Sequence, residues 1–279
     1  MRVIQKVFLG IALLAMALTF GPANAVAADS LKIVGSTTVY PLAEACVLIF
    51  KGSHKDAKIE LSAGGSSVGI KSIIDGLADI GNASRDIQKK EIDLAKSKGV
   101  NPVKHVVALD CVVPIVHPSN PVSNLTIEQL NGIFTGKTKN WKEVGGKDEE
   151  IVVVSREDNS GTFDTWQHFV LKKDPLAETA LKQQSNPAVR AYVAKSPKAI
   201  GYVGYGFAHH ASTKSLKVNG VTASPETVYN KTYPMWRELF MFTNGEPKGL
   251  AKEFLDFVKS AKGQEIAEGP DAGFIKLKK

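Results

Sequence analysis

Apolar runs with two different periods alternate along the first third of the chain. Short runs such as residues 31–34 and 58–62 indicate strands, whereas the apolar positions of residues 39–51 favour a helix. The full pattern predicts strands at 31–34, 58–62, 78–81 and 104–116 and helices at 39–51, 68–76 and 88–97. Such alternation predicts an α/β fold with a mostly parallel sheet.

The long apolar run at residues 104–116 divides the pattern in two. It ends among Pro114, Pro118 and Pro121, and we interpret it as a segment that leaves one domain and enters another. The second domain is predicted to contain helices at 126–135, from 162 and at 186–196, and strands at 151–154 and 199–206. The later segments, 216–218, 225–229, 238–243, 249–261 and 263–268, indicate a return to the first domain.

Polar turns rich in serine, threonine and glycine connect several strands to the helices that follow. The turns lie at residues 35–38, 64–69 and 155–162, and a fourth lies at 82–86. The first N–H groups of a helix have no partner within the helix, so they favour an anion. Turns of this kind converge at the carboxyl ends of the strands in an open α/β sheet. Together with Arg156 they predict a pocket for a small tetrahedral oxyanion, although each turn alone is also compatible with an ordinary helix cap.

The first residues have the features of a secretory signal peptide. A basic start with Arg2 and Lys6 precedes an apolar stretch at 7–20 and the small residues before Ala25. We expect residues 1–25 to be removed, with cleavage after Ala25 or Ala27, and the mature protein to be periplasmic. Nothing later in the chain is apolar over the length that a membrane span needs.

Charge and composition narrow the class of ligand. The formal net charge of +7 falls to +5 when Arg2 and Lys6 are removed with the signal peptide, which suits an anion. The lysines are scattered, which disfavours nucleic acid. Cys46 and Cys111 fit two buried thiols better than a disulfide, and their spacing matches no metal or redox motif. The pair His209 and His210 fits a solvated loop, so we expect no metal and no cofactor.

Several segments, in this order, match one family. The chain resembles the periplasmic phosphate-binding proteins, the solute receptors of phosphate ABC transporters, in their compact form. The matching segments are GSTTVYP at 35–41, GGSSVGI at 64–70, DIGNASR at 79–85, REDNSGT at 156–162 and IGY at 200–202.

The resemblance implies a monomer with a two-lobed, type II periplasmic-binding-protein fold, each lobe a mixed, mostly parallel sheet flanked by helices. Lobe 1 would contain residues 26–113 and 208–279, and lobe 2 residues 114–207, with hinges near 111–115 and 205–208. The lobes would close on inorganic phosphate and deliver it to the membrane permease and ATPase subunits of an ABC importer. The implied ligands are Ser36, Thr37, Ser66, Ser67, Ser84, Arg85, Arg156, Ser160, Gly161 and Thr162, with Asp158 supporting Arg156.

One position departs from the family. Longer members have an aspartate, which accepts a proton from phosphate, where this chain has Arg85. The candidate acceptors are then Asp86, Asp110 and Asp158. Two alternatives stay open: a receptor for sulfate, molybdate or another oxyanion, and a secreted phosphate-ester hydrolase with Ser67 or Ser160 as nucleophile. The hydrolase is disfavoured because the chain has no Gly-x-Ser-x-Gly motif, and we expect a binding protein rather than an enzyme.

Overall fold

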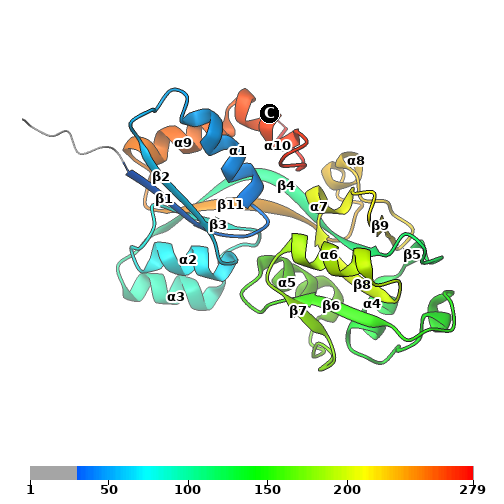
Figure 1. Cartoon of the computed structure of the whole chain (residues 1–279). Coiled ribbons are helices and arrows are strands. Elements are labelled where there is room, and N and C mark those ends of the chain that lie inside the picture. Colours follow the sequence, from blue (N-terminus) through cyan, green and yellow to red (C-terminus); the bar gives the residue numbers. More distant parts are fainter. Residues whose placement is uncertain (1–29, 279) are drawn as a thin grey trace, which may run out of the picture.

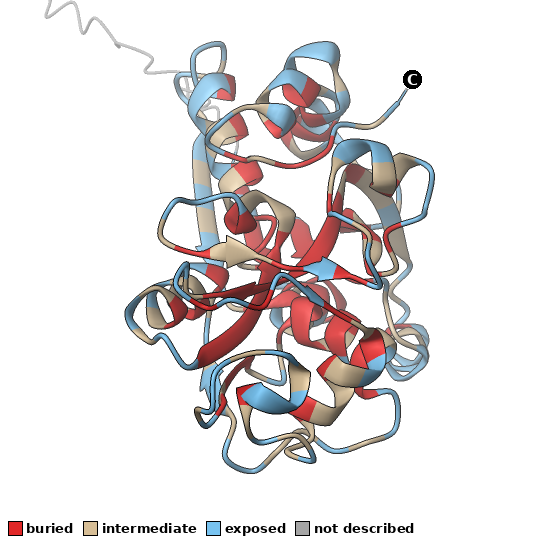
Figure 2. Cartoon of the chain, turned by 90° about the vertical axis from the view of Figure 1, so that its right-hand side faces the viewer, coloured by how far each residue is buried: buried red, intermediate tan, exposed pale blue. Residues whose placement is uncertain are grey.

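The computed structural model of the chain describes residues 30–278, which form two lobes connected through strand β4 (Pro102–Val116) (Figure 1). Residues 102–111 of β4 pair antiparallel with β11 (Trp236–Asn244), and residues 112–116 pair antiparallel with β8 (Ala199–Gly204). One strand therefore belongs to the sheets of both lobes. Figure 2 shows that the buried residues follow the strands through the middle of the molecule.

The sheet of lobe 1 has the order β2–β1–β3–β11–β4. Strands β1 (Ser30–Gly35), β2 (Lys58–Ala63) and β3 (Ile80–Ala83) are parallel, and β11 is inserted antiparallel between β3 and β4. Helices cover both faces of this sheet (Figure 1). One face carries α1 (Tyr40–Phe50), α9 (Gly249–Lys259) and α10 (Ala261–Glu268), and the other carries α2 (Ser66–Ile74) and α3 (Lys89–Ser97).

The sheet of lobe 2 continues from β4 in the order β4–β8–β6–β7, with β6 (Val152–Arg156) parallel to both β8 and β7 (Leu181–Gln183). Its core contains the stacked rings of Trp166 and Tyr202, whose centroids are 4.2 Å apart. The helices are α4 (Ile127–Phe134), α5 (Gly161–Trp166), a π-helix (Gln167–Leu171), α6 (Asn186–Lys195) and α7 (Tyr205–Ala208), with a 3₁₀ turn at Trp141–Val144.

The chain returns to lobe 1 later than the sequence pattern indicates. We expected residues 208–279 in lobe 1, but β9 (Lys214–Ser215) pairs with the end of β4, and β10 (Lys217–Val218) pairs with β5 (Asn124–Leu125). Helix α8 (Pro225–Tyr229) follows before β11 begins. The apolar run at 216–218 is too short to indicate which sheet it joins. We therefore propose lobe 1 as residues 30–111 and 236–278, with the second hinge just before β11 rather than at residues 205–208.

The mixed α/β architecture confirms the predicted fold class, and most predicted elements form within a few residues of their expected bounds. The exception in lobe 2 is the strand predicted at 199–206, which ends at Gly204 because α7 starts at Tyr205. Cys46 and Cys111 are both buried and unbridged, as expected. The predicted signal peptide lies outside the described residues. Among residues 30–278, no helix combines the length and apolar character needed to cross a membrane.

The contact between α1 and α9 generates a prediction about stability. Phe254 is fully buried and meets Phe50 edge to face at 5.4 Å between ring centroids. We expect Phe254→Ala to lower the free energy of unfolding by about 3–5 kcal/mol, because it leaves a cavity in the core. Leu48, on the same helix as Phe50, is 76% exposed, so Leu48→Ala should change it by no more than about 0.5 kcal/mol. Urea titration measures both, and similar losses in the two variants would contradict this account of the lobe 1 core.

Candidate oxyanion site

Three helices begin at the interface between the lobes, each after a strand. In lobe 1, α1 and α2 follow β1 and β2, and in lobe 2, α5 follows β6. Ser160 is the N-cap of α5, and its hydroxyl accepts a hydrogen bond from the N–H of Phe163 at 3.3 Å. Gly65 is the N-cap of α2 and Ser160 is the N-cap of α5, a position that favours both residue types, whereas α1 starts after the polar turn at residues 36–39. The positive dipole ends of these helices then lie close together, which favours a bound anion.

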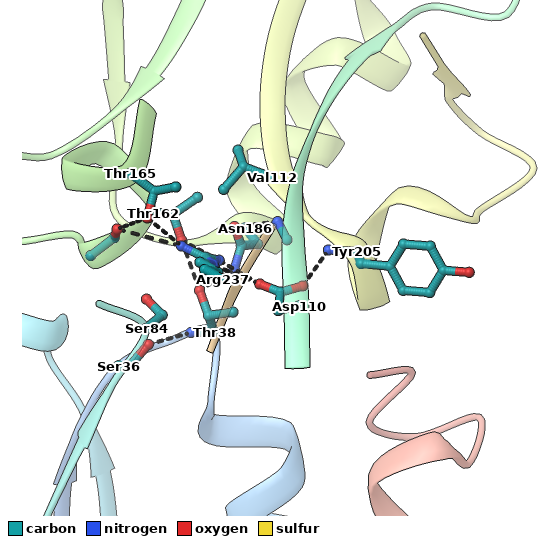
Figure 3. Close-up of polar contacts among 12 residues, drawn as sticks. Ser36, Thr38, Ser84, Asp110, Val112, Thr162, Thr165, Asn186, Tyr205 and Arg237 are labelled. Carbon is teal, nitrogen blue, oxygen red and sulfur yellow. Dashed lines mark hydrogen bonds and ion pairs between the residues drawn. The ribbon is translucent and has the colours of Figure 1, made fainter. Parts of the chain in front are cut away.

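Hydroxyl groups from the two lobes meet between these helix starts (Figure 3). Thr38 Oγ1 lies 2.9 Å from Thr162 Oγ1, and Ser66 Oγ lies 3.2 Å from Ser84 Oγ. Gly161 lies against the serine pair, because a Cβ built there would be 2.7 Å from Ser84 Oγ and closer still to Ser66. All of these hydroxyls are buried. The lobes therefore enclose a set of donors of the size and chemistry that suit an oxyanion.

Arg156, at the end of β6, brings a positive charge into this interface. Its side chain is 1% exposed, and it donates to the carbonyls of Gln183 and Gln184, to Asn186 Oδ1 and, across the cleft, to Thr37 Oγ1. These four bonds leave one of its five N–H donors without an acceptor among the described residues. Burial, followed by the charge of Arg237, lowers the pKa of Arg156 to about 10, so the guanidinium is still charged at pH 7.

A second buried arginine is already neutralised. Arg237 in β11 forms an ion pair with Asp110 in β4, with Nη2 and Nε at 2.6 and 2.8 Å from Asp110 Oδ2. Its Nη2 also donates to Thr162 Oγ1 at 3.1 Å (Figure 3). The N–H of Tyr205 donates to Asp110 Oδ1 at 2.8 Å. The net buried charge of the centre therefore comes from Arg156.

Comparisons with known proteins agree with this geometry. The profile of the PBP superfamily domain matches residues 21–262. The phosphate-binding protein PstS of Bacillus subtilis is 38% identical over 249 residues, which cover 89% of this chain and 81% of the relative. This chain belongs to the phosphate-binding proteins of the PBP superfamily. The phosphate-binding protein PstS of Borreliella burgdorferi is 30% identical over 98% of this chain and 99% of the relative.

Solved structures of other phosphate-binding proteins share the fold. A phosphate ABC transporter substrate-binding protein of Clostridium perfringens, solved with bound phosphate, has a TM-score of 0.82 at 38% identity, over 90% of this chain and all of that one. An ABC-type phosphate transport receptor of Vibrio cholerae has a TM-score of 0.73 at 28% identity, over 88% of this chain and all of that one. The two-lobed fold of this phosphate-binding protein is therefore that of its family.

The structure brings most of the predicted site residues to the interface, where their role as ligands stays a prediction. Those that meet there are Ser36, Thr37, Ser66, Ser84, Arg156, Ser160, Gly161 and Thr162. The hydroxyl of Ser160 also caps its own helix, and Ser36 Oγ accepts from the N–H groups of Thr38 and Val39 in the turn before α1. Within residues 30–278, no group of three or more His, Cys, Asp or Glu side chains is placed to hold a metal ion.

Two predicted roles differ from what the structure shows. The expectation that Asp158 supports Arg156 is wrong, because the Asp158 side chain is 72% exposed and its Oδ1 accepts from Lys182 Nζ at 2.7 Å. Arg85 donates to Ser67 Oγ, but the rest of its guanidinium is occupied by Glu91, Asp164 and the Asp86 carbonyl rather than facing the hydroxyl pairs. The family resemblance suggested the role of Arg85 and sequence proximity that of Asp158, whereas contacts with Glu91, Asp164 and Lys182 occupy the two side chains.

The sequence analysis did not assign Thr38, Asn186 and Arg237 to the site. Asn186 Nδ2 donates to Thr38 Oγ1 at 2.9 Å, so an amide from α6 reaches the first turn of lobe 1. Thr38 lies in the polar turn at residues 35–38, which was recognised, but Ser36 and Thr37 were assigned as the ligands of that turn instead. The available signal for Arg237 was a charge inside the apolar strand 236–244. Asn186 carries no such signal beyond its place at a helix start.

The close approach of Gly161 to lobe 1 predicts the effect of a methyl group. Gly161 has no positive φ, so an alanine meets no backbone strain, but its Cβ would collide with Ser66 and Ser84 when the lobes are together. We expect Gly161→Ala to weaken phosphate binding about tenfold to a hundredfold, since overpacking costs about 1–3 kcal/mol. Small-angle scattering should show less contraction with phosphate than for the parent. Gly269→Ala, where the nearest atom to the new Cβ is 3.3 Å away, is the control; equal behaviour of both variants would count against steric closure at Gly161.

Proposed function

We propose that this protein binds inorganic phosphate in the periplasm, by closure of its two lobes, and delivers it to the permease and ATPase subunits of an ABC importer. The observation that carries the proposal is the uncompensated charge of Arg156. Its hydrogen-bond acceptors among the described residues are neutral oxygens, and it is almost fully buried. A buried charge without a counterion is costly, so the closed interface requires an anion.

The donors around this charge favour a tetrahedral oxyanion over a carboxylate. Hydroxyls of Thr37, Thr38 and Thr162 and the starts of three helices surround it from both lobes. Phosphate can accept from several such groups at once, and charge-assisted bonds are stronger in an interface from which water is excluded. The phosphate named in the relatives and bound in the Clostridium perfringens structure supports the same ion for this chain.

Asp110 is our proposed acceptor for the phosphate proton. Of the three candidates, Asp86 and Asp158 have side chains that are 53% and 72% exposed, and each is paired with a lysine. Asp110 is fully buried and bonded to Arg237, which in turn contacts Thr162. A buried acceptor rejects a fully deprotonated ion, because the acceptor then faces negative charge without a proton between them.

The hydrolase alternative gains no support from the two candidate nucleophiles. Ser160 Oγ accepts from a backbone N–H within α5, and Ser67 Oγ accepts from Arg85 Nη2 at 3.0 Å. Neither serine bonds a histidine that could act as its base in the described part of the chain. The relatives are also named as binding proteins rather than enzymes.

Removal of the unpaired charge should weaken phosphate binding. We expect Arg156→Ala to raise the phosphate dissociation constant about tenfold to a hundredfold, since a hydrogen bond to a charged group contributes about 1.5–3 kcal/mol. Arg156→Lys should restore it only in part, because one ammonium cannot replace the planar group. Isothermal titration of phosphate-free protein measures both. Asp158→Asn, which breaks only the exposed pair with Lys182, is the control and should bind as the parent does; parent-like binding by Arg156→Ala would place the essential cation elsewhere.

The proposed proton acceptor predicts discrimination between ions. The parent should bind phosphate one to one and prefer it to sulfate by a large factor near pH 7. Asp110→Asn should narrow the ratio of the two affinities by about tenfold or more, since an amide no longer repels the deprotonated ion. Asp86→Asn should leave the ratio unchanged. Equal affinity of the parent for both ions in calorimetry would contradict a carboxylate acceptor.

A further inference from the structure

A third buried arginine, Arg85, has contacts of a different kind from those of Arg156. It lies in the turn after β3, its side chain is 7% exposed, and it makes five hydrogen bonds, as many as it has N–H donors. Four stay in lobe 1 and reach Ser67 Oγ, the Asp86 carbonyl and both carboxylate oxygens of Glu91. The fifth crosses to lobe 2, where Arg85 Nε lies 2.5 Å from Asp164 Oδ2.

The lobe 1 half of this arrangement is fixed in place. Glu91 is in the first turn of α3, and its Oε2 accepts from the N–H of Gln88 at 2.8 Å as part of a capping box. The bidentate contact with Glu91 therefore aims the guanidinium from a rigid helix end. Burial opposes the charge of Arg85, but Glu91 and Asp164 outweigh it and raise its pKa. Arg85 thus presents a permanent charge to lobe 2.

The lobe 2 half lies on the helix that also builds the oxyanion site. Asp164 is in α5, one turn after Gly161 and Thr162, and its side chain is 19% exposed. A second contact holds the start of the same helix to lobe 1: Asn159 Nδ2 donates to the Gly64 carbonyl at 3.0 Å, and the Ser67 N–H donates to the Asn159 carbonyl at 3.2 Å. Both contacts join the lobes directly.

We propose that the ion pair between Arg85 and Asp164 is a latch that holds the lobes closed and sets how long phosphate stays bound. Arg85 is then a positioning residue rather than a phosphate ligand. The proposal rests on the proposed function, because the latch matters for phosphate only if the lobes close on it. When the lobes separate, Arg85 keeps Glu91 but loses Asp164, so opening costs the energy of that ion pair. The apparent affinity for a ligand rises with the population of the closed state.

The latch lies where solvent ions can reach it. Arg85 and Asp164 line a groove of about 490 Å³ between the lobes, together with Phe169 and Trp236. Added salt can therefore weaken the pair without any change to the helix starts that form the oxyanion site. A salt titration and a substitution are two independent ways to disturb the same contact.

The experiment compares Asp164→Asn with the matched control Asp86→Asn. Asp86 is next to Arg85 in sequence, but its carboxylate pairs with Lys104 inside lobe 1. Stopped-flow measurement on the mature chain should show that phosphate leaves Asp164→Asn about ten to a hundred times faster than the parent, with an association rate within about twofold. Asp164→Glu, which keeps the charge, should recover part of the loss. Asp86→Asn should match the parent in both rates.

A second readout does not require phosphate. Fluorophores at exposed positions 96 and 173, in the two lobes, report the closed fraction of the phosphate-free protein by energy transfer. This fraction should fall in Asp164→Asn, and in the parent as sodium chloride rises from about 20 mM to about 500 mM. If Asp164→Asn does not fold, the salt titration of the parent decides.

The outcomes separate the two hypotheses. A parent that binds no phosphate contradicts the proposed function, while the closed fraction still tests the latch. Parent-like dissociation from Asp164→Asn, an equal acceleration in Asp86→Asn, or a closed fraction that does not depend on salt would each overturn the latch.

Discussion

The buried charge of Arg156 is the constraint on which the centre of this molecule depends. A guanidinium that is 1% exposed gives up its hydration, and within residues 30–278 its hydrogen-bond partners are neutral oxygens rather than carboxylates. The surrounding architecture reduces that cost only in part, through two backbone carbonyls, an amide oxygen and a hydroxyl. Full compensation requires an anion at the place where the two lobes meet, so anion binding and lobe closure are thermodynamically linked.

Three arginines at the lobe interface differ mainly in the carboxylates that each one contacts. Arg85 has two, Glu91 and Asp164, Arg237 has Asp110, and Arg156 has none among its hydrogen-bond partners. An arginine with a carboxylate partner contributes little net charge to its surroundings, whereas an unpaired one attracts an anion. The pairing pattern therefore sets Arg156, the proposed ligand-binding cation, apart from Arg85 and Arg237, whose charges are paired with carboxylates.

The sequence was sufficient to predict those parts of the structure that depend on residues close to one another in the chain. The strand before each turn and the helix start at Ser160 follow from local pattern and backbone chemistry. The partners of the arginines could not be predicted in this way, because Asp164 lies 79 residues from Arg85 and Asp110 lies 127 residues from Arg237. The lobe boundary that we propose differs from the expected one for a related reason. Strands β9 and β10 have two residues each, and only their nonlocal pairing shows where they belong.

Arg85 shows how the residue at one position can have a different function while the fold stays the same. The resemblance places an aspartate there in longer members of the family, where it accepts a proton from the ligand. An arginine at that position does not repel an anion. Its buried positive charge is, however, a second one besides that of Arg156, and it must be neutralised. Glu91 and Asp164 supply that neutralisation, and Asp164 does so from the opposite lobe. By that resemblance, Arg85 stands where longer members have a proton acceptor, and in this structure it contacts the opposite lobe through Asp164. The buried carboxylate near α5 is Asp110, which is linked to Thr162 through Arg237. If Asp110 is the proton acceptor, as we propose, selectivity for a protonated ion and the positioning of Arg237 depend on the same side chain.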